Sequence, residues 1–107
     1  MKLIPFDERD GYIWINGKFE EWKEAKTHVL NHGLHYGSCV FEGIRVYNKK
    51  IFKLNEHVTR LFYSAKKLHL NLRFSEDEIC RSISDTVLKQ DIIDGYVRPV
   101  IWRGSEK

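Results

Sequence analysis

The dipeptide Asn16-Gly17 is the feature that most restricts how this chain can fold. Asparagine and glycine most readily adopt the positive φ angles that a two-residue type I′ turn requires. The segments Tyr-Ile-Trp-Ile at 12–15 and Lys-Phe-Glu-Glu-Trp at 18–22 flank the pair. The pattern predicts a β-hairpin, so at least part of the chain folds as antiparallel sheet.

Two longer segments, 40–47 and 96–102, alternate with the two-residue period of a β-strand. Pro99 has no amide hydrogen to donate, so the second segment is predicted to lie at a sheet edge or to be interrupted. A turn at 48–50 joins the first segment to a short strand at 51–53. These segments predict a second hairpin and a further strand near the C-terminal end.

Two helices are predicted between these strands. The first has Asn55 as its N-cap and a stripe at helical spacing that consists of Val58, Leu61, Phe62, Ala65 and Leu68. The second begins at Ser75, whose spacing to Glu78 forms a capping box, and ends near Lys89. Its predicted inward-facing residues are Ile79, Ile83, Val87 and Leu88. The order of elements predicts an α+β fold, an antiparallel sheet with two helices on one side.

Length and composition limit the possible functions. A chain of 107 residues can form one domain at most. Its net charge of +3 comes from scattered basic residues and gives no reason to expect nucleic acid binding. No window has the length and apolarity of a membrane span or a signal peptide. Two cysteines predict neither a disulfide framework nor a zinc motif, so the expected location is cytoplasmic.

Three histidines lie close together in the less regular segment before residue 40. His28, His32 and His35 have spacings that occur among metal ligands, but Cys39 is the only further candidate ligand nearby. Histidines that hydrogen-bond to the backbone are the favoured interpretation, and no metal site is predicted. The polar segment 1–10 is interpreted as a leader strand or a loose arm.

Each of the two long predicted strands places an arginine beside aromatic residues on one face. In the first strand this face has Phe41, Gly43, Arg45 and Tyr47, and the opposite face has Val40, Glu42, Ile44 and Val46. Tyr96 and Arg98 share a face in the same way. A guanidinium group binds planar oxyanions with two parallel hydrogen bonds, and a glycine lets a ligand approach the backbone. A structural salt bridge to Glu42, Glu76 or Asp77 is the alternative for each single arginine. Together, the two pairs predict one wall of a pocket for an anionic, ring-shaped ligand, without indicating a reaction.

Three motifs in the same order resemble the N-terminal half of branched-chain amino acid aminotransferases, which are pyridoxal-phosphate enzymes of fold type IV. The first is H-x-L-H-Y-G-x-x-V-F-E-G-I-R-x-Y at 32–47. The second is F-K-L-N-E-H-x-x-R-L-x-x-S-A at 52–65, and the third is Y-V-R-P at 96–99. The resemblance extends from Tyr12 to the end, which implies that residues 1–107 are the N-terminal small domain of such an enzyme.

The resemblance also implies roles for individual residues. Arg60 would bind the phosphate of the cofactor, pyridoxal 5′-phosphate. Tyr96 would lie near the α-carboxylate of the substrate, and Arg98 would receive the distal carboxylate of glutamate. Tyr36 would complete the pocket of a neighbouring subunit, which implies a homodimer or a larger homo-oligomer. Three residues would line the pocket beside cofactor and substrate: Phe41, Gly43 and Arg45.

The catalytic lysine of these enzymes lies in a larger C-terminal domain that this sequence does not include. Its hairpin and loop lysines do not match that residue: Lys23, Lys26, Lys49 and Lys50. The resemblance therefore implies an enzyme that moves an amino group between leucine, isoleucine or valine and 2-oxoglutarate, with this chain inactive alone. The alternatives are a non-catalytic binding module that keeps the fold, a D-amino-acid aminotransferase and an aminodeoxychorismate lyase.

Overall fold

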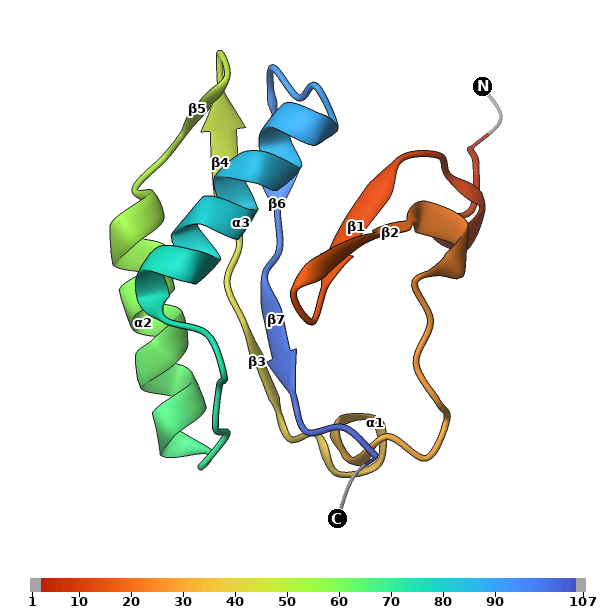
Figure 1. Cartoon of the computed structure of the whole chain (residues 1–107), viewed down its shortest axis with the longest axis vertical. Helices are drawn as coiled ribbons and strands as arrows, with labels where there is room; N and C mark the ends of the chain where they lie inside the picture. The colour runs from red at the N-terminus through yellow and green to blue at the C-terminus, as the bar shows by residue number, and fades with distance from the viewer. Residues whose placement is uncertain (1–2, 106–107) are drawn as a thin grey trace.

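The Asn16-Gly17 turn forms as predicted in the computed structural model, which describes residues 3–105. Asn16 and Gly17 have φ angles of 51° and 99° and join strands β1 (Tyr12–Ile15) and β2 (Lys18–Glu21). The backbone amide of Tyr12 donates to the Oε1 of Gln90 at 2.8 Å. This bond ties the hairpin to the end of the second long helix, beside which it lies in Figure 1.

The N-terminal arm contains no strand between residues 3 and 10, so the leader-strand alternative is wrong. It contains one turn of 3₁₀ helix, η1 (Phe6–Glu8), and a second turn, η2 (Trp22–Glu24), follows the hairpin. The indole of Trp22 donates to the carbonyl of Phe6, which connects the two turns. Met1 and Lys2 lie outside the described residues.

Each of the two long predicted strands is divided in the middle. The first gives β3 (Cys39–Phe41) and β4 (Ile44–Tyr47), and the second gives β6 (Gly95–Val97) and β7 (Val100–Trp102). Strand β3 pairs antiparallel with β7, and β4 pairs antiparallel with β6. The sheet that the sequence predicts as one is therefore split, with β1–β2 as a third piece.

The register continues across the break, because Phe41 pairs with Val100 and Ile44 pairs with Val97. The residues in the break are Glu42 and Gly43 on one strand and Arg98 and Pro99 on the other, and we call these four residues the junction. Pro99 accounts for the interruption because it has no amide hydrogen to donate. Its carbonyl still accepts a hydrogen bond from the amide of Glu42 at 3.1 Å.

The second hairpin forms, but one residue earlier than predicted. Its turn is Asn48-Lys49, with φ angles of 48° and 66°, and its second strand is β5 (Lys50–Ile51) in place of 51–53. Because this strand is short, the chain turns early at Lys53, which has a φ angle of 52° and is the N-cap of helix α2 (Leu54–Lys67). The prediction of Asn55 as N-cap is therefore wrong.

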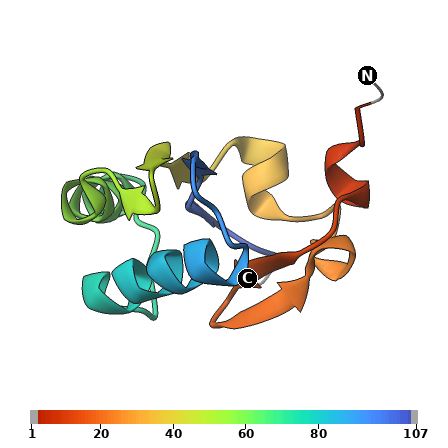
Figure 2. The same cartoon turned by 90° about the horizontal axis from the view of Figure 1, so that it is seen from above.

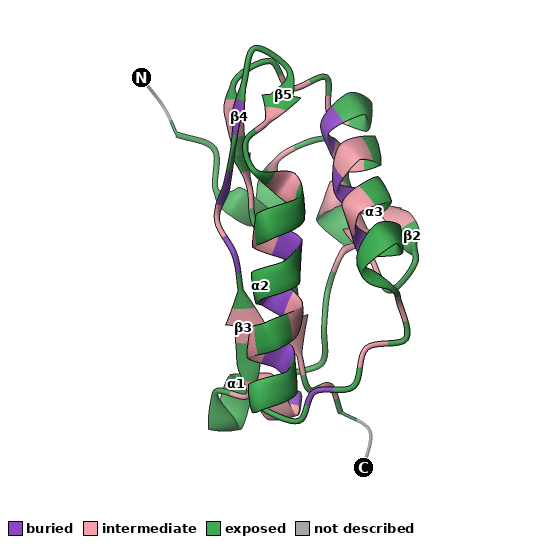
Figure 3. Ribbon diagram, turned by 90° about the vertical axis from the view of Figure 1, so that its left-hand side faces the viewer, coloured by how far each residue is buried: buried purple, intermediate pink, exposed green. Residues whose placement is uncertain are grey.

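The second long helix, α3 (Glu76–Lys89), begins with both hydrogen bonds of the predicted capping box between Ser75 and Glu78. The core forms where α2 and α3 cover the same face of β4, and its buried centre consists of Ile44, Val58, Ile79 and Ile83. Figures 2 and 3 show this layer of two helices beside the strands. Leu88 and Leu68, predicted to face inward, are exposed: Leu88 is next to last in α3, and Leu68 is the C-cap that follows α2.

One helix was not predicted, α1 (His32–Tyr36), which contains Gly33. The amides of its first turn donate to carbonyls far along the chain: His32 to Gly104 at 3.0 Å, and Gly33 to Arg103 at 2.8 Å. These bonds stabilise a short helix that the sequence alone does not favour. Each helix within residues 3–105 is too short or too polar to cross a membrane.

Candidate functional site

Five of the residues that the sequence predicts to line a pocket lie together on the exposed face of the strands, at and beside the junction. The alternation of β4 sets this face, since Ile44 and Val46 are buried and Arg45 is exposed. In the register, Arg45 pairs with Tyr96 of the neighbouring strand. The five residues are Phe41, Gly43, Arg45, Tyr96 and Arg98.

Gly43 creates space that the side chain of Tyr96 occupies. A Cβ atom on Gly43 would lie 2.5 Å from the hydroxyl oxygen of Tyr96 and about 3 Å from the nearest ring carbons. The sequence predicts that this glycine lets a ligand approach the backbone, whereas here the phenol of the chain itself makes the close approach. Gly43 therefore determines where the Tyr96 hydroxyl lies.

Arg98 is held between two aromatic side chains. Its Nε and Nη2 donate to the hydroxyl of Tyr96 at 3.2 Å and 3.1 Å. Its guanidinium carbon lies 4.6 Å from the centre of the Phe41 ring, a distance typical of a cation–π contact. Both contacts fix the plane of the guanidinium group while leaving the side chain exposed. The arrangement presents a fixed cation beside an aromatic surface.

Neither Arg45 nor Arg98 forms a salt bridge in the described part of the chain. The guanidinium carbon of Arg45 lies 5.5 Å from the ring centre of Tyr47, on the same exposed face. The salt-bridge alternative, with Glu42, Glu76 or Asp77 as partner, is therefore wrong for both strand arginines. Their charges remain available to an anionic ligand.

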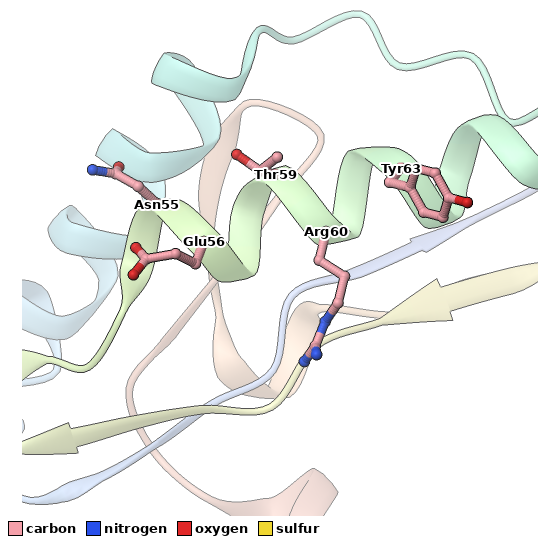
Figure 4. Close-up of a pocket in the computed structure, with 5 residues that line it drawn as sticks. All are labelled: Asn55, Glu56, Thr59, Arg60 and Tyr63. Atoms are coloured by element: carbon pink, nitrogen blue, oxygen red, sulfur yellow. The ribbon is translucent and has the colours of Figure 1, made fainter.

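Arg60 approaches the junction from α2, and Figure 4 shows its side chain extending toward the strands. Its Nε donates to Oε2 of Glu42 at 2.8 Å, and its Nη2 donates to Oε1 at 2.7 Å. His57, one turn earlier on α2, contacts Oε1 through its Nδ1 at 2.7 Å. The side chain of Glu42 is 6% exposed and that of Arg60 is 67% exposed. One edge of the guanidinium group thus binds a buried carboxylate, and the rest faces solvent.

Glu42 and His57 are the site residues that the sequence prediction missed. A signal for Glu42 was present, because a carboxylate at the buried position of an alternating strand requires a cationic partner. The i, i+3 spacing of His57 and Arg60 places both on one side of a helix, where they can meet such a carboxylate. The sequence does not reveal that β3 and α2 lie next to each other.

The hydrogen bonds from Arg60 lower the pKa of the Glu42 carboxyl below its ordinary value, although burial acts in the opposite direction; His57 lowers it further. A carboxyl whose pKa is lower in the folded state than in the unfolded state contributes its full stabilisation at pH values above the unfolded-state pKa. This stabilisation is lost as the pH falls from there through the folded-state pKa. We expect the free energy of unfolding to decrease below about pH 4.5. Denaturant melts from pH 7 to pH 3 should give a shallower decrease for Glu42→Gln, and equal slopes would contradict the expectation.

Tyr36 lies apart from the junction, at the end of α1. Its exposed ring packs at a tilt against His32, with ring centres 4.5 Å apart. The histidines near it have separate partners: His28 binds the amide of Leu30, His32 the hydroxyl of Ser38 and His35 the carbonyl of Val29. No cluster of three or more potential metal ligands occurs within residues 3–105. His28 and His35 bond to the backbone, as the favoured interpretation predicts, whereas His32 bonds to a side chain.

Known proteins resemble this chain in sequence and in fold. Residues 39–107 match the family model for Amino-transferase class IV. A probable branched-chain-amino-acid aminotransferase of Rickettsia typhi is 44% identical over 104 residues, which are 97% of this chain and 36% of the relative. The Escherichia coli branched-chain amino acid aminotransferase superposes with a TM-score of 0.88 at 39% identity, covering 92% of this chain and 35% of that structure.

A second solved structure also has a TM-score of 0.88, at 43% identity. The match covers 92% of this chain and 35% of the chain in that structure. It is the T.th. branched-chain amino acid aminotransferase complexed with N-(5′-phosphopyridoxyl)-L-glutamate. The chain spans about a third of the length of the relatives it matches. The matched residues 39–107 are more than half of the chain and include the junction and Arg60. The chain therefore belongs to the class IV aminotransferase family.

Proposed function

We propose that this chain is the N-terminal part of a branched-chain amino acid aminotransferase, in which it forms one wall of the active site. The observation that carries the proposal is the exposed cation Arg60, held by a buried carboxylate beside a junction lined with arginine and aromatic side chains. Relatives with this name match almost the whole chain. The reaction would transfer an amino group between leucine, isoleucine or valine and 2-oxoglutarate.

The expected cofactor is pyridoxal 5′-phosphate, and the residues present fit its phosphate group. Two of the five guanidinium hydrogens of Arg60 bind Glu42, which leaves three for phosphate oxygens. The solved T.th. relative contains a phosphopyridoxyl derivative of glutamate. The cofactor supplies the electron sink that makes amino-group transfer possible, and this chain contributes to its binding and orientation.

The exposed face of the junction would bind the substrates. Arg98 is oriented by Tyr96 and Phe41 and would receive the distal carboxylate of glutamate or 2-oxoglutarate. Tyr96 would lie near the α-carboxylate, whose negative charge a hydroxyl donor can stabilise. Gly43 would act by fixing the position of Tyr96, and Arg45 would add positive charge to the same face.

We also propose that residues 1–107 form the small domain and that a separate C-terminal domain provides the catalytic lysine. A transaminase needs that lysine to hold the cofactor and to transfer a proton. Of the lysines that the sequence analysis set aside, Lys23 forms a salt bridge with Asp10, and Lys49 and Lys50 lie in the β4–β5 hairpin. Because the proposed catalytic lysine belongs to the other domain, the chain alone should have no transaminase activity.

A homo-oligomer in the cytoplasm is proposed for the complete enzyme. Four apolar side chains on and just before α1 are exposed: Val29, Leu30, Leu34 and Tyr36. Burial of this surface against another subunit would place Tyr36 in the neighbouring pocket. Both cysteines are free, as is usual in a reducing compartment. Sedimentation velocity of the chain at high concentration should show self-association, and a clean monomer would contradict it.

A chimaera tests the proposed function directly. Residues 1–107 replace the aligned N-terminal third of the Escherichia coli relative, and turnover is measured with leucine, isoleucine or valine and 2-oxoglutarate. We expect a folded chimaera with activity, and we expect Arg60→Ala in it to raise the pyridoxal phosphate concentration needed for half-maximal activity. The Glu20→Gln chimaera is the control, because Glu20 lies on β2 and its one salt bridge within residues 3–105 is with Lys18.

None of the alternatives predicts turnover with branched-chain L-amino acids in the same assay. A non-catalytic binding module predicts a chimaera that folds, as judged by circular dichroism and size exclusion, but has no turnover. A D-amino-acid aminotransferase predicts turnover with D-amino acids in place of branched-chain L-amino acids, and an aminodeoxychorismate lyase predicts neither. Each of these outcomes would overturn the proposal.

A further inference from the structure

Glu42 is the residue around which Arg60 is oriented. We propose that Glu42 and His57 are positioning residues, which hold Arg60 so that one edge of its guanidinium group stays open to the oxygens of a phosphate. Arg60 would contact the phosphate, while Glu42 and His57 would act only through Arg60. The inference rests on the proposed function, because it takes the phosphate to be that of the cofactor.

The hydrogen bonds define which edge of the guanidinium group is occupied. Nε and Nη2 of Arg60 both donate to Glu42, so the carboxylate binds the side edge of the group. The end edge, formed by Nη1 and the second hydrogen of Nη2, has no acceptor among the described residues. This edge has the two-donor geometry that matches two oxygens of a phosphate. Glu42 therefore orients Arg60 without competing for the edge that a phosphate needs.

Glu42, which we call the anchor, is buried, whereas Arg60, the side chain that it orients, is largely exposed. Glu42 is buried at the junction, where its amide is bonded to the carbonyl of Pro99 and its carboxylate receives Arg60 and His57. Its position is therefore fixed from three directions. Arg60 is largely exposed, and an exposed arginine without an anchor would lose side-chain entropy on binding a ligand. With the anchor, part of that entropy is already lost in the free chain.

Electrostatics alone predicts the opposite effect, which makes the inference testable. The negative charge of Glu42 weakens the attraction between Arg60 and an anion, so its removal should tighten phosphate binding if charge were decisive. Glu56 provides a matched control. It lies four residues before Arg60 on α2, it lines the same surface depression in Figure 4, and it pairs with Lys53 at 3.7 Å. Glu56→Gln removes the same charge without removing the anchor.

The experiment titrates inorganic phosphate into the ¹⁵N-labelled chain and follows the Nε–H signal of Arg60 and the amide signals of α2 by NMR. In the wild type we expect a saturable shift and slow solvent exchange of Arg60 Nε–H, because that hydrogen is bonded to a buried carboxylate. Arg60→Ala should lose the saturable shifts. Glu42→Gln should weaken phosphate binding by about three- to tenfold and speed the exchange, whereas Glu56→Gln should leave the affinity unchanged or raise it.

Two further variants keep the test valid if Glu42→Gln does not fold. Glu42→Asp preserves the charge but shortens the side chain, so positioning predicts weaker binding and electrostatics predicts no change. His57→Ala removes one of the three bonds to the carboxylate and should weaken binding less than Glu42→Gln does. Unchanged affinity in His57→Ala would overturn the role of His57.

The outcomes separate this inference from the function on which it rests. If the wild type responds to phosphate through Arg60 but the Glu42 variants bind phosphate as tightly or more tightly, the positioning role is overturned and the proposed function stands. If the wild type shows no response at Arg60, both are overturned. Weaker binding in both Glu42 variants with unchanged or tighter binding in Glu56→Gln supports the inference.

Discussion

Leu61→Ala is expected to lower the free energy of unfolding by about 2–5 kcal/mol. Leu61 is 1% exposed and lies on the buried side of α2, next in sequence to Arg60. Its truncation leaves a cavity at a fully buried position of α2, which the close-packed neighbours fill only in part. Because α2 carries both Arg60 and His57, the loss should also disorder the cationic side of the site. Urea unfolding followed by circular dichroism measures the change.

Leu88→Ala is the matched control, since it makes the same substitution on the other long helix. Leu88 is 76% exposed near the C-terminal end of α3 and contributes little buried surface. We expect a change within about 0.5 kcal/mol, as is usual for surface positions. Equal effects of the two substitutions would contradict the difference in burial between Leu61 and Leu88.

Gly43→Ala is expected to change the site more than it changes the stability. The new methyl group would lie 2.5 Å from the Tyr96 hydroxyl oxygen, so the ring has to move. Tyr96 is 48% exposed and can turn toward solvent, so the loss of stability should be about 1 kcal/mol, the low end for an overpacked site. The hydroxyl would then leave Arg98, and in the active chimaera KM for 2-oxoglutarate should rise about tenfold or more.

Gly37→Ala separates the effect of side-chain contact from that of backbone strain. Gly37 has a φ of 68° at the end of α1, and a Cβ there would meet no atom within 4 Å. This variant should lose about 1 kcal/mol of stability through its left-handed backbone, with KM unchanged. NMR signals of the Tyr96 ring should move in Gly43→Ala and stay in place in Gly37→Ala. The reverse result would contradict the role given to Gly43.

The sequence by itself determined the features that depend on neighbours along the chain. Asn16-Gly17 specified its own turn, since the φ preferences of two residues suffice. Ser75 and Glu78 specified the start of α3, because the residues that bond in a capping box are only three apart. The alternation around Arg45 gave the correct buried and exposed faces of β4. The order of three motifs pointed to the aminotransferase family, to which the chain belongs.

Only the tertiary structure decided the features that join distant segments. Helix α1 forms around Gly33 because carbonyls of Arg103 and Gly104 accept its first amides, and no local pattern reports such a contact. Arg60 could be expected to bind an anion, but its partner Glu42 lies 18 residues away on a different element. The packing of α2 against the junction brings this cation to the buried carboxylate. A buried carboxylate is costly without a partner, and Arg60 and His57 supply that partner here.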